Sequence, residues 1–398
     1  MDRLTPIPSP SPVATREGSR GGPPHPPAPS PQVERGNASR GRTGVMGAMT
    51  RRRALAALGL ASLGAFAACA PFGDGEVPPL LFARDGNLGA IAPSGREQRQ
   101  LTDVPLPAFA RDPAWAPDGT SIIYSYTPPP QPQQGAGNVT FTLPVADIYQ
   151  LPIGGGDPRV LVRHDGSTEQ LEAPTWSPDG RWIYFSYSAL LIDSENVIRG
   201  RDFGIARVPA TGGQREVILT EAAFPTLSAD GTQLAVVREN PDDGATVLWV
   251  GAPDGSGGQT ILNAGDSEAI TAPRFSPDGT RIVYGALVPP EERQPLFATP
   301  AVSQRSGLFD LLPPRRVAAA GLAHGLPKDL WLVGTDGAGL RRLTHLAEDD
   351  PAAAWSPDGS TLFIGAGGGL YTLRPDGSPP VRVATPGSHG LVDWRRSG

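Results

Sequence analysis

The segment Pro174-Thr-Trp-Ser-Pro-Asp-Gly180 decides the fold, because similar segments recur along the 398-residue chain. Ser, Pro and Gly suit positions i, i+1 and i+3 of a type I β-turn, where proline presets φ and glycine fits the exit. A fixed segment that recurs in this way is typical of a repeat architecture. The sequence therefore predicts one tight turn per repeat. The other copies are 113–119, 225–231, 273–279 and 353–359.

Each turn is followed by two apolar runs, a Gly-rich turn and a further short run. Runs of four to six apolar residues between turn signals are typical of β-strands. With the run that precedes the turn, each unit has four short strands, which indicates an antiparallel all-β repeat. The first runs after the turns are 122–125, 183–186, 234–237, 282–284 and 362–364, and the second are 147–151, 203–208, 246–250, 329–333 and 369–373.

The two ends of this repeat region complete one another. Residues 80–83, 88–91 and 97–102 supply the second, third and fourth strands of a unit that has no first strand, and 391–394 supply a first strand without successors. Joining them closes a ring and removes the exposed sheet edges. We therefore predict an all-β, six-bladed β-propeller of four-stranded antiparallel blades over 78–396, closed by the C-terminal strand.

The repeats resemble the TolB-type, WD-like family of β-propellers, whose blades carry Pro-x-Trp-Ser-Pro-Asp-Gly before a strand. The resemblance covers about 320 residues, and the third copy departs from it with Ala229 in place of proline. It implies the fold. TolB also has an N-terminal α/β domain, for which we find no counterpart, so a role in a cell-envelope complex is not carried over.

The N-terminal region has the composition of a targeting segment rather than of a folded domain. Residues 1–48 contain ten prolines and few apolar residues, which predicts a disordered tail or a true start at Met46 or Met49. Arg51 to Arg53 and the apolar run 54–68 form a signal peptide over 49–68, which resembles a twin-arginine signal.

This signal ends in Phe-Ala-Ala-Cys69, which resembles the lipobox of bacterial lipoproteins. The resemblance implies cleavage before Cys69, a lipid on its thiol and extracytoplasmic attachment to a bacterial membrane, periplasmic or at the cell surface. Residues 69–77 would then be a linker. Since Cys69 is the single cysteine, the sequence excludes disulfides and cysteine-based zinc sites.

Charge differs between the two parts of the chain. Residues 1–68 hold nine arginines and three acidic residues, whereas the remainder holds 25 basic and 37 acidic residues. Nucleic-acid binding needs a basic face, so an acidic body argues against that class of partner.

Long insertions join the second strand of a blade to its third, and all of them fall on one face of a propeller. They span 127–146, 188–202 and 287–327. Repeat proteins often bind partners through such a face. We expect a protein- or peptide-binding scaffold, with another envelope protein or a peptide as partner. The third insertion contains a candidate docking segment, Leu308, Phe309, Leu311 and Leu312, which could equally pack over the channel.

Acidic residues precede the first strand of five blades on this same face. Converging carboxylates could attract a divalent cation or a basic partner, although solvated loops in an acidic protein are the simpler interpretation. We predict no resident cofactor. The candidate acids are Asp112, Glu172, Glu221, Glu268, Asp349 and Asp350.

Signatures of enzymes are missing from the sequence. It has no Gly-x-Ser-x-Gly, phosphate loop or His-Glu-x-x-His, so no catalytic residue is assigned. The alternative to a scaffold is an extracytoplasmic enzyme or solute-binding protein, lyase-like or metal-dependent, with its site at the channel mouth.

Overall fold

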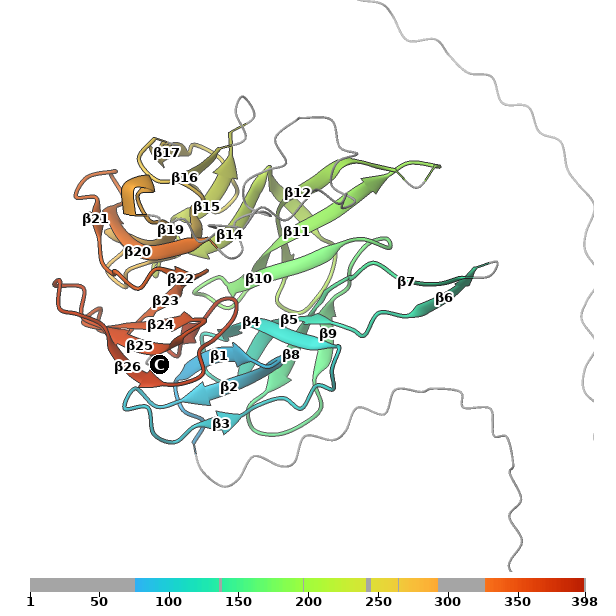
Figure 1. The fold of residues 1–398 in the computed structure, drawn as a ribbon, viewed down its shortest axis with the longest axis horizontal. Helices are drawn as coiled ribbons and strands as arrows, with labels where there is room; N and C mark the ends of the chain where they lie inside the picture. The colour runs from blue at the N-terminus through green and yellow to red at the C-terminus, as the bar shows by residue number, and fades with distance from the viewer. Residues whose placement is uncertain are drawn as a thin grey trace, which may run out of the picture. The chain divides into compact units, whose positions relative to one another are not determined.

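The computed structural model is a ring of six four-stranded antiparallel sheets around a common centre (Figure 1). It describes residues 76–135, 138–195, 197–240, 245–263, 265–292 and 326–396. The six first strands contact one another in a closed circuit, so they form the inner wall of the ring. The predicted all-β six-bladed propeller is confirmed.

The blades follow one another along the chain, and each consists of four strands in order from the innermost outward. Blade 1 is β27 (Asp393–Trp394), β1 (Leu80–Arg84), β2 (Asn87–Ile91) and β3 (Arg99–Gln100); blade 2 is β4 (Phe109–Trp115), β5 (Ser121–Thr127), β8 (Asp147–Pro152) and β9 (Arg159–Val162); blade 3 is β10 (Gln170–Trp176), β11 (Trp182–Ile192), β12 (Ile198–Pro209) and β13 (Glu216–Thr220). Blade 4 is β14 (Ala222–Leu227), β15 (Leu234–Glu239), β16 (Thr246–Gly251) and β17 (Gln259–Leu262); blade 5 is β18 (Thr271–Phe275), β19 (Arg281–Leu287), β20 (Pro327–Gly334) and β21 (Arg341–Arg342); blade 6 is β23 (Ala352–Trp355), β24 (Leu362–Ala366), β25 (Gly369–Leu373) and β26 (Val381–Ala384). Outside the four-stranded pattern, β22 (Glu348–Asp349) pairs with β20, and β6 (Pro132–Gly135) pairs with β7 (Asn138–Phe141).

The repeated Ser-Pro-Asp-Gly segments form closed turns between the first and second strands. In blade 6 the Gly359 N–H donates to the Ser356 carbonyl, and the Asp358 carboxylate accepts from the Ser360 N–H and the Ser356 hydroxyl. The Ser356 hydroxyl oxygen also accepts from the Thr361 N–H, at the start of the next strand. One side chain therefore fixes both sides of the turn.

Two of the tryptophans that precede the turns, Trp115 and Trp355, pack against the preceding blade. Trp115 is buried, and its indole N–H donates to the Pro79 carbonyl in front of β1. Trp355 is buried too and donates to the Arg274 carbonyl on β18. Each tryptophan thus satisfies its polar atom while filling the space between two blades.

The ring closes through blade 1, as the sequence predicted. Leu80 pairs with Trp394 and Leu81 with Asp393 across β1 and β27. The Asp393 carboxylate also accepts from the Trp115 N–H at 2.7 Å, which ties the closing strand to blade 2. Closure gives β1 a strand partner on its inner side, so blade 1 reaches the same four strands as the others.

The two faces of the ring have different connections. The turn face carries the hairpins from first to second and from third to fourth strands, while the loop face carries the other connections. On the loop face the insertion 127–146 contains the β6–β7 hairpin. The sequence favours a loop over 188–202, but most of this segment continues β11 and β12, which stay paired from Ser188↔Phe203 out to Ile192↔Ile198.

Several predictions fall on parts of the chain that the structure does not describe. These are the signal and lipidation site at Cys69 and the docking segment with Leu308, Phe309, Leu311 and Leu312. They stay predictions. Within the described ranges, no helix combines the length and apolar character needed to cross a bilayer.

Candidate functional site

The innermost strands surround the centre of the ring, and in blades 1, 2, 3 and 5 one position of the repeat lines a hollow there. This is the residue immediately before the aromatic or leucine position, and in four blades it is a small Ala or Thr. Blades 5 and 1 have charged residues instead, Arg274 and Asp393. The full set is Ala114, Thr175, Thr226, Arg274, Ala354 and Asp393.

At the loop-face end, Asp112 joins three blades. Its carboxylate accepts a hydrogen bond at 2.8 Å from the N–H of Leu391, which lies just before the closing strand β27. It also accepts one at 3.3 Å from the N–H of Ala173 on β10 of blade 3. Asp112 is only 6% exposed and has φ of 54°, at a β-bulge of β4. Ala173 has φ of 50° at the matching bulge of β10. Buried backbone donors need such partners, so Asp112 has a structural role.

Next to it, Arg111 and Glu172 form an ion pair between blades 2 and 3. Burial opposes the charge of Arg111, but Glu172 and Asp112 outweigh it and raise the pKa of Arg111. Of these two candidate acids, Asp112 is therefore buried in the molecule, and Glu172 is half-buried and held by Arg111.

The other candidate acids do not converge into one site. Asp350 pairs with Lys328, the only lysine of the chain, whose side chain is buried. Glu221, Glu268 and Asp349 are exposed residues of different blades. Among the described residues, no group of three or more His, Cys, Asp or Glu side chains lies close enough to hold a metal ion.

The turn-face end of the channel holds a hollow formed by four blades. The space open to the centres of water-sized molecules is about 40 Å³, which suits a few waters or one small ligand group. Arg274 reaches it from blade 5, opposite the side chains of blades 1 to 3. The lining residues are Ala114, Trp115, Ala116, Pro117, Thr175, Trp176, Arg274, Asp393, Trp394 and Arg396.

Burial disfavours the charged forms of both Arg274 and Asp393 in this hollow. Burial lowers the pKa of the Arg274 guanidinium, and Asp393 and Asp112 only partly oppose that shift. Burial likewise raises the pKa of Asp393, against the Trp115 hydrogen bond and the charge of Arg274. Among the described residues, the Arg274 guanidinium has one hydrogen bond, to the Pro273 carbonyl, and no ion pair.

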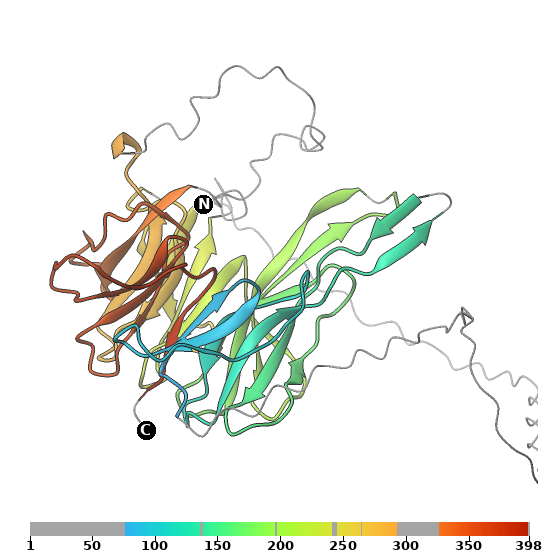
Figure 2. The same cartoon turned by 60° about the horizontal axis from the view of Figure 1, so that its bottom comes forward.

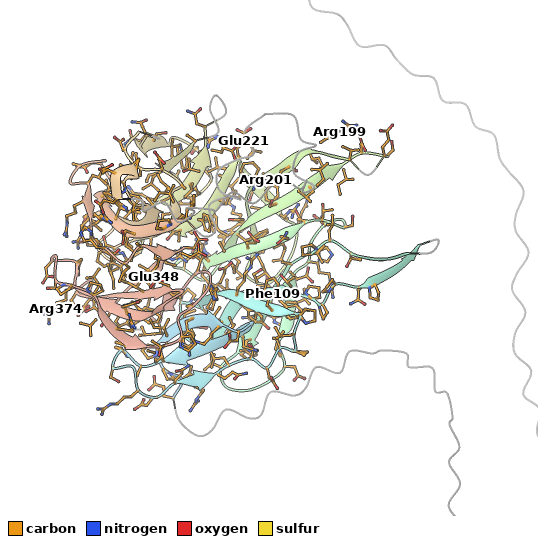
Figure 3. All side chains as sticks on the ribbon, in the orientation of Figure 1. Phe109, Arg199, Arg201, Glu221, Glu348 and Arg374 are labelled. Carbon is orange, nitrogen blue, oxygen red and sulfur yellow. The ribbon has the colours of Figure 1, made fainter. Side chains whose placement is uncertain are left out.

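On the loop face, the β11–β12 hairpin ends in an apolar tip. Figure 2 shows it and the β6–β7 hairpin rising on the side of the ring away from the C-terminal end. Arg199 lies near the tip and Arg201 farther back (Figure 3). They pair with Asp193 and Glu239 of the same chain. The exposed tip residues are Leu191, Ile192, Val197 and Ile198, at 51%, 37%, 41% and 43% exposure.

Sequence reasoning missed both the hollow and the apolar tip. Arg274 was visible as the one charged residue at its position among the five repeat copies, where the others have Ala or Thr. The tip was visible as two apolar runs around Asp193-Ser-Glu, a turn signal typical of a hairpin.

No known family model matches the chain. An uncharacterized protein of Agrobacterium fabrum is 28% identical over 211 residues, which is 50% of this chain and 62% of that protein. The chain therefore matches less than two thirds of that curated relative.

Solved structures resemble the whole ring. A provisionally named TolB of Agrobacterium tumefaciens aligns with a TM-score of 0.50 at 15% identity, over 79% of this chain and 92% of that one. TolB of Acinetobacter baumannii aligns at 0.52 and 15%, over 82% and 68%. A chain of a nidogen/laminin complex aligns at 0.53 and 12%, over 80% and 98%. The chain thus has the fold of the TolB-type six-bladed propellers.

Proposed function

We propose that the chain is an extracytoplasmic, lipid-anchored β-propeller that binds another envelope protein or a peptide through its loop face. One observation carries the proposal: hairpins of two adjacent blades project from that face, and one ends in four exposed apolar side chains. An apolar tip in water gains free energy when a partner covers it.

The ribbon that carries the tip also offers backbone groups to a partner. β13 pairs with β12 only from Gly204 to Arg207, so the outer edge of β12 from Ile198 to Asp202 has no strand partner among the described residues. An extended peptide can add to such an edge as a further strand. Arg199 and Arg201 on this edge disfavour indiscriminate pairing.

The position of the N-terminal end supports the same orientation. Glu76 pairs with Arg395, and β1 begins on the turn face. A lipid at Cys69 would therefore tether the turn face to the membrane through 69–77, and the loop face would point away from it. A chain similar in fold was solved in a nidogen/laminin complex, so this architecture is compatible with protein binding.

The test is crosslinked capture of partners from native membranes with the full-length lipoprotein and the double variant L191S/I198S. We expect a near-stoichiometric partner with the wild-type chain and at least a tenfold loss with the variant. The matched control is V381S, since Val381 is 62% exposed on β26, an outermost strand. Equal capture by all three proteins would contradict the proposal.

Membrane attachment is tested separately. Replacing Cys69 by Ser removes the acylated thiol, so the protein should move from the membrane to the soluble fraction. Retention in the membrane fraction would refute lipid anchoring at this residue while leaving the loop-face proposal open to its own test.

A further inference from the structure

The turn-face hollow has the composition of a binding site that the loop-face proposal does not use. It draws side chains from blades 1, 2, 3 and 5, so residues far apart in sequence meet at one small volume. Its titratable members are Arg274, Arg396 and Asp393. Asp112, outside the hollow, also acts on Arg274, so a ligand is indicated by unsatisfied donors rather than by net charge.

Arg274 has more donors than the protein satisfies. A guanidinium has five N–H donors, and the described residues provide one hydrogen bond, to a neighbouring backbone carbonyl. Four other blades place uncharged residues at the equivalent position, so the fold does not require an arginine there. A partly buried cation without an ion pair is costly and becomes favourable when an anion joins it.

A second polar group, on a residue that lines the hollow, lacks a partner. Trp176 lines the hollow, and its indole Nε1 is buried without a hydrogen-bond acceptor in the protein. The repeat shows what is unusual at this position, because Trp115 and Trp355 both donate to a carbonyl of the preceding blade. An indole N–H can only donate, so it calls for an acceptor.

We infer that the turn-face mouth of the channel binds a carboxylate monoanion, with Arg274 as its main ligand and Trp176, Thr175 and Arg396 around it. A carboxylate supplies two acceptor oxygens, which suits the unsatisfied guanidinium donors of Arg274 and the donor-only indole of Trp176. The small volume admits the carboxylate group and leaves the rest of the ligand at the open mouth. That group can belong to a small organic acid or to the C-terminus of a peptide.

The test is calorimetric titration of the full-length chain with acetate, succinate, tetra-alanine with a free C-terminus and the same peptide as its amide. We expect one site of millimolar affinity for carboxylates and at least tenfold weaker binding of the amide. Binding of acetate alone identifies a small acid, and stronger binding of the free-acid peptide identifies a peptide end. No saturable binding of any carboxylate would overturn the inference.

Two variants connect the binding to these side chains. R274Q keeps a planar polar group, removes the buried charge and should weaken binding about tenfold or more while keeping the fold. R396Q, at an exposed residue, should weaken it about threefold and serves if R274Q does not fold. The control is R374Q, at the exposed arginine labelled in Figure 3, which lies outside the hollow. Binding that is equal in R274Q and wild type, or in R396Q and wild type if R274Q is unfolded, would overturn the inference.

Discussion

The turn face and the loop face of the ring differ in how uniform their connections are. On the turn face five Asp-Gly turns repeat the same hydrogen bonds, with Gly φ between 68° and 71°. On the loop face the connections of the described residues differ in length and form, from the long β11–β12 hairpin to the 3-10 helix Pro290–Glu292. We infer that the repeated turns serve folding in every blade, and that the connections particular to one blade are free to serve binding.

Two residues do not follow this difference between the faces, and substituting them tests it. Asp112 belongs to the loop-face end of the channel but holds three blades together, while Arg274 breaks the repeat near the turn face. Stability should therefore depend on repeated positions and on Asp112, and binding on positions that depart from the repeat.

The largest effect is expected at an aromatic position of the repeat. Trp355→Ala would empty the space between blades 5 and 6 and leave the Arg274 carbonyl without its donor. We expect a loss of about 3 to 5 kcal/mol in the free energy of unfolding. Urea denaturation measures it, with Trp182→Ala as control, because Trp182 is only half-buried. An equal loss in both variants would show that the repeat position has no special weight.

Asp112 tests the exception on the loop face. Asp112→Ala leaves the N–H groups of Leu391 and Ala173 without an acceptor, so we expect a loss of about 2 to 4 kcal/mol by the same measurement. Glu221→Ala, at an exposed acid of the same face, should stay within about 0.5 kcal/mol. Equal stability of the two variants would mean that the hydrogen bonds of Asp112 do not stabilise the ring.

A smaller effect should appear in the acid stability of the turns. The Ser356 hydroxyl, followed by the Ser360 N–H and hydroxyl, lowers the pKa of Asp358 to about 2, below about 3.9 for an unfolded aspartate. The ionised turn therefore adds stability above about pH 4, and this is lost as pH falls to 2. Wild type should melt slightly above D358N at pH 7, and the difference should vanish near pH 2. NMR titration of S356A should give a higher Asp358 pKa, and an unchanged value would contradict this origin.

The smallest effect on stability is expected at the hairpin tip. Leu191 and Ile198 are about half exposed, so L191S/I198S should melt within about 2 °C of wild type. Differential scanning calorimetry checks this. A large drop would mean that the apolar tip packs onto the rest of the protein, and the loss of partner capture by this variant would then need another explanation.

Much of the ring follows from the repeat alone. The Ser-Pro-Asp-Gly turns predict the hairpins because turn chemistry acts locally. The split first blade predicts the closure, because a lone first strand at one end and three strands without one at the other complete a blade. The sequence did not predict which loop-face residues meet. Arg111 and Glu172 are 61 residues apart, and only the ring geometry brings them together. The same holds for Arg274 and Asp393, whose shared hollow depends on the diameter of the channel.

The insertions were predicted in position but not in form. The sequence favours a loop over 188–202 as an insertion between the second and third strands, yet the β11–β12 register continues through most of this segment. Backbone pairing extends a hairpin irrespective of side-chain burial, so periodicity is a poor guide once both sheet faces are solvated.

The closing strand determines when blade 1 can be completed during synthesis of the chain. A ribosome releases β1 to β3 roughly 300 residues before β27, so blade 1 waits unfinished while the other five are made. Pairings between residues so distant in sequence form slowly and late. Loss of residues 391–394 would therefore leave an open ring with a bare strand at Leu80–Arg84, a form that proteases and chaperones recognise as incomplete.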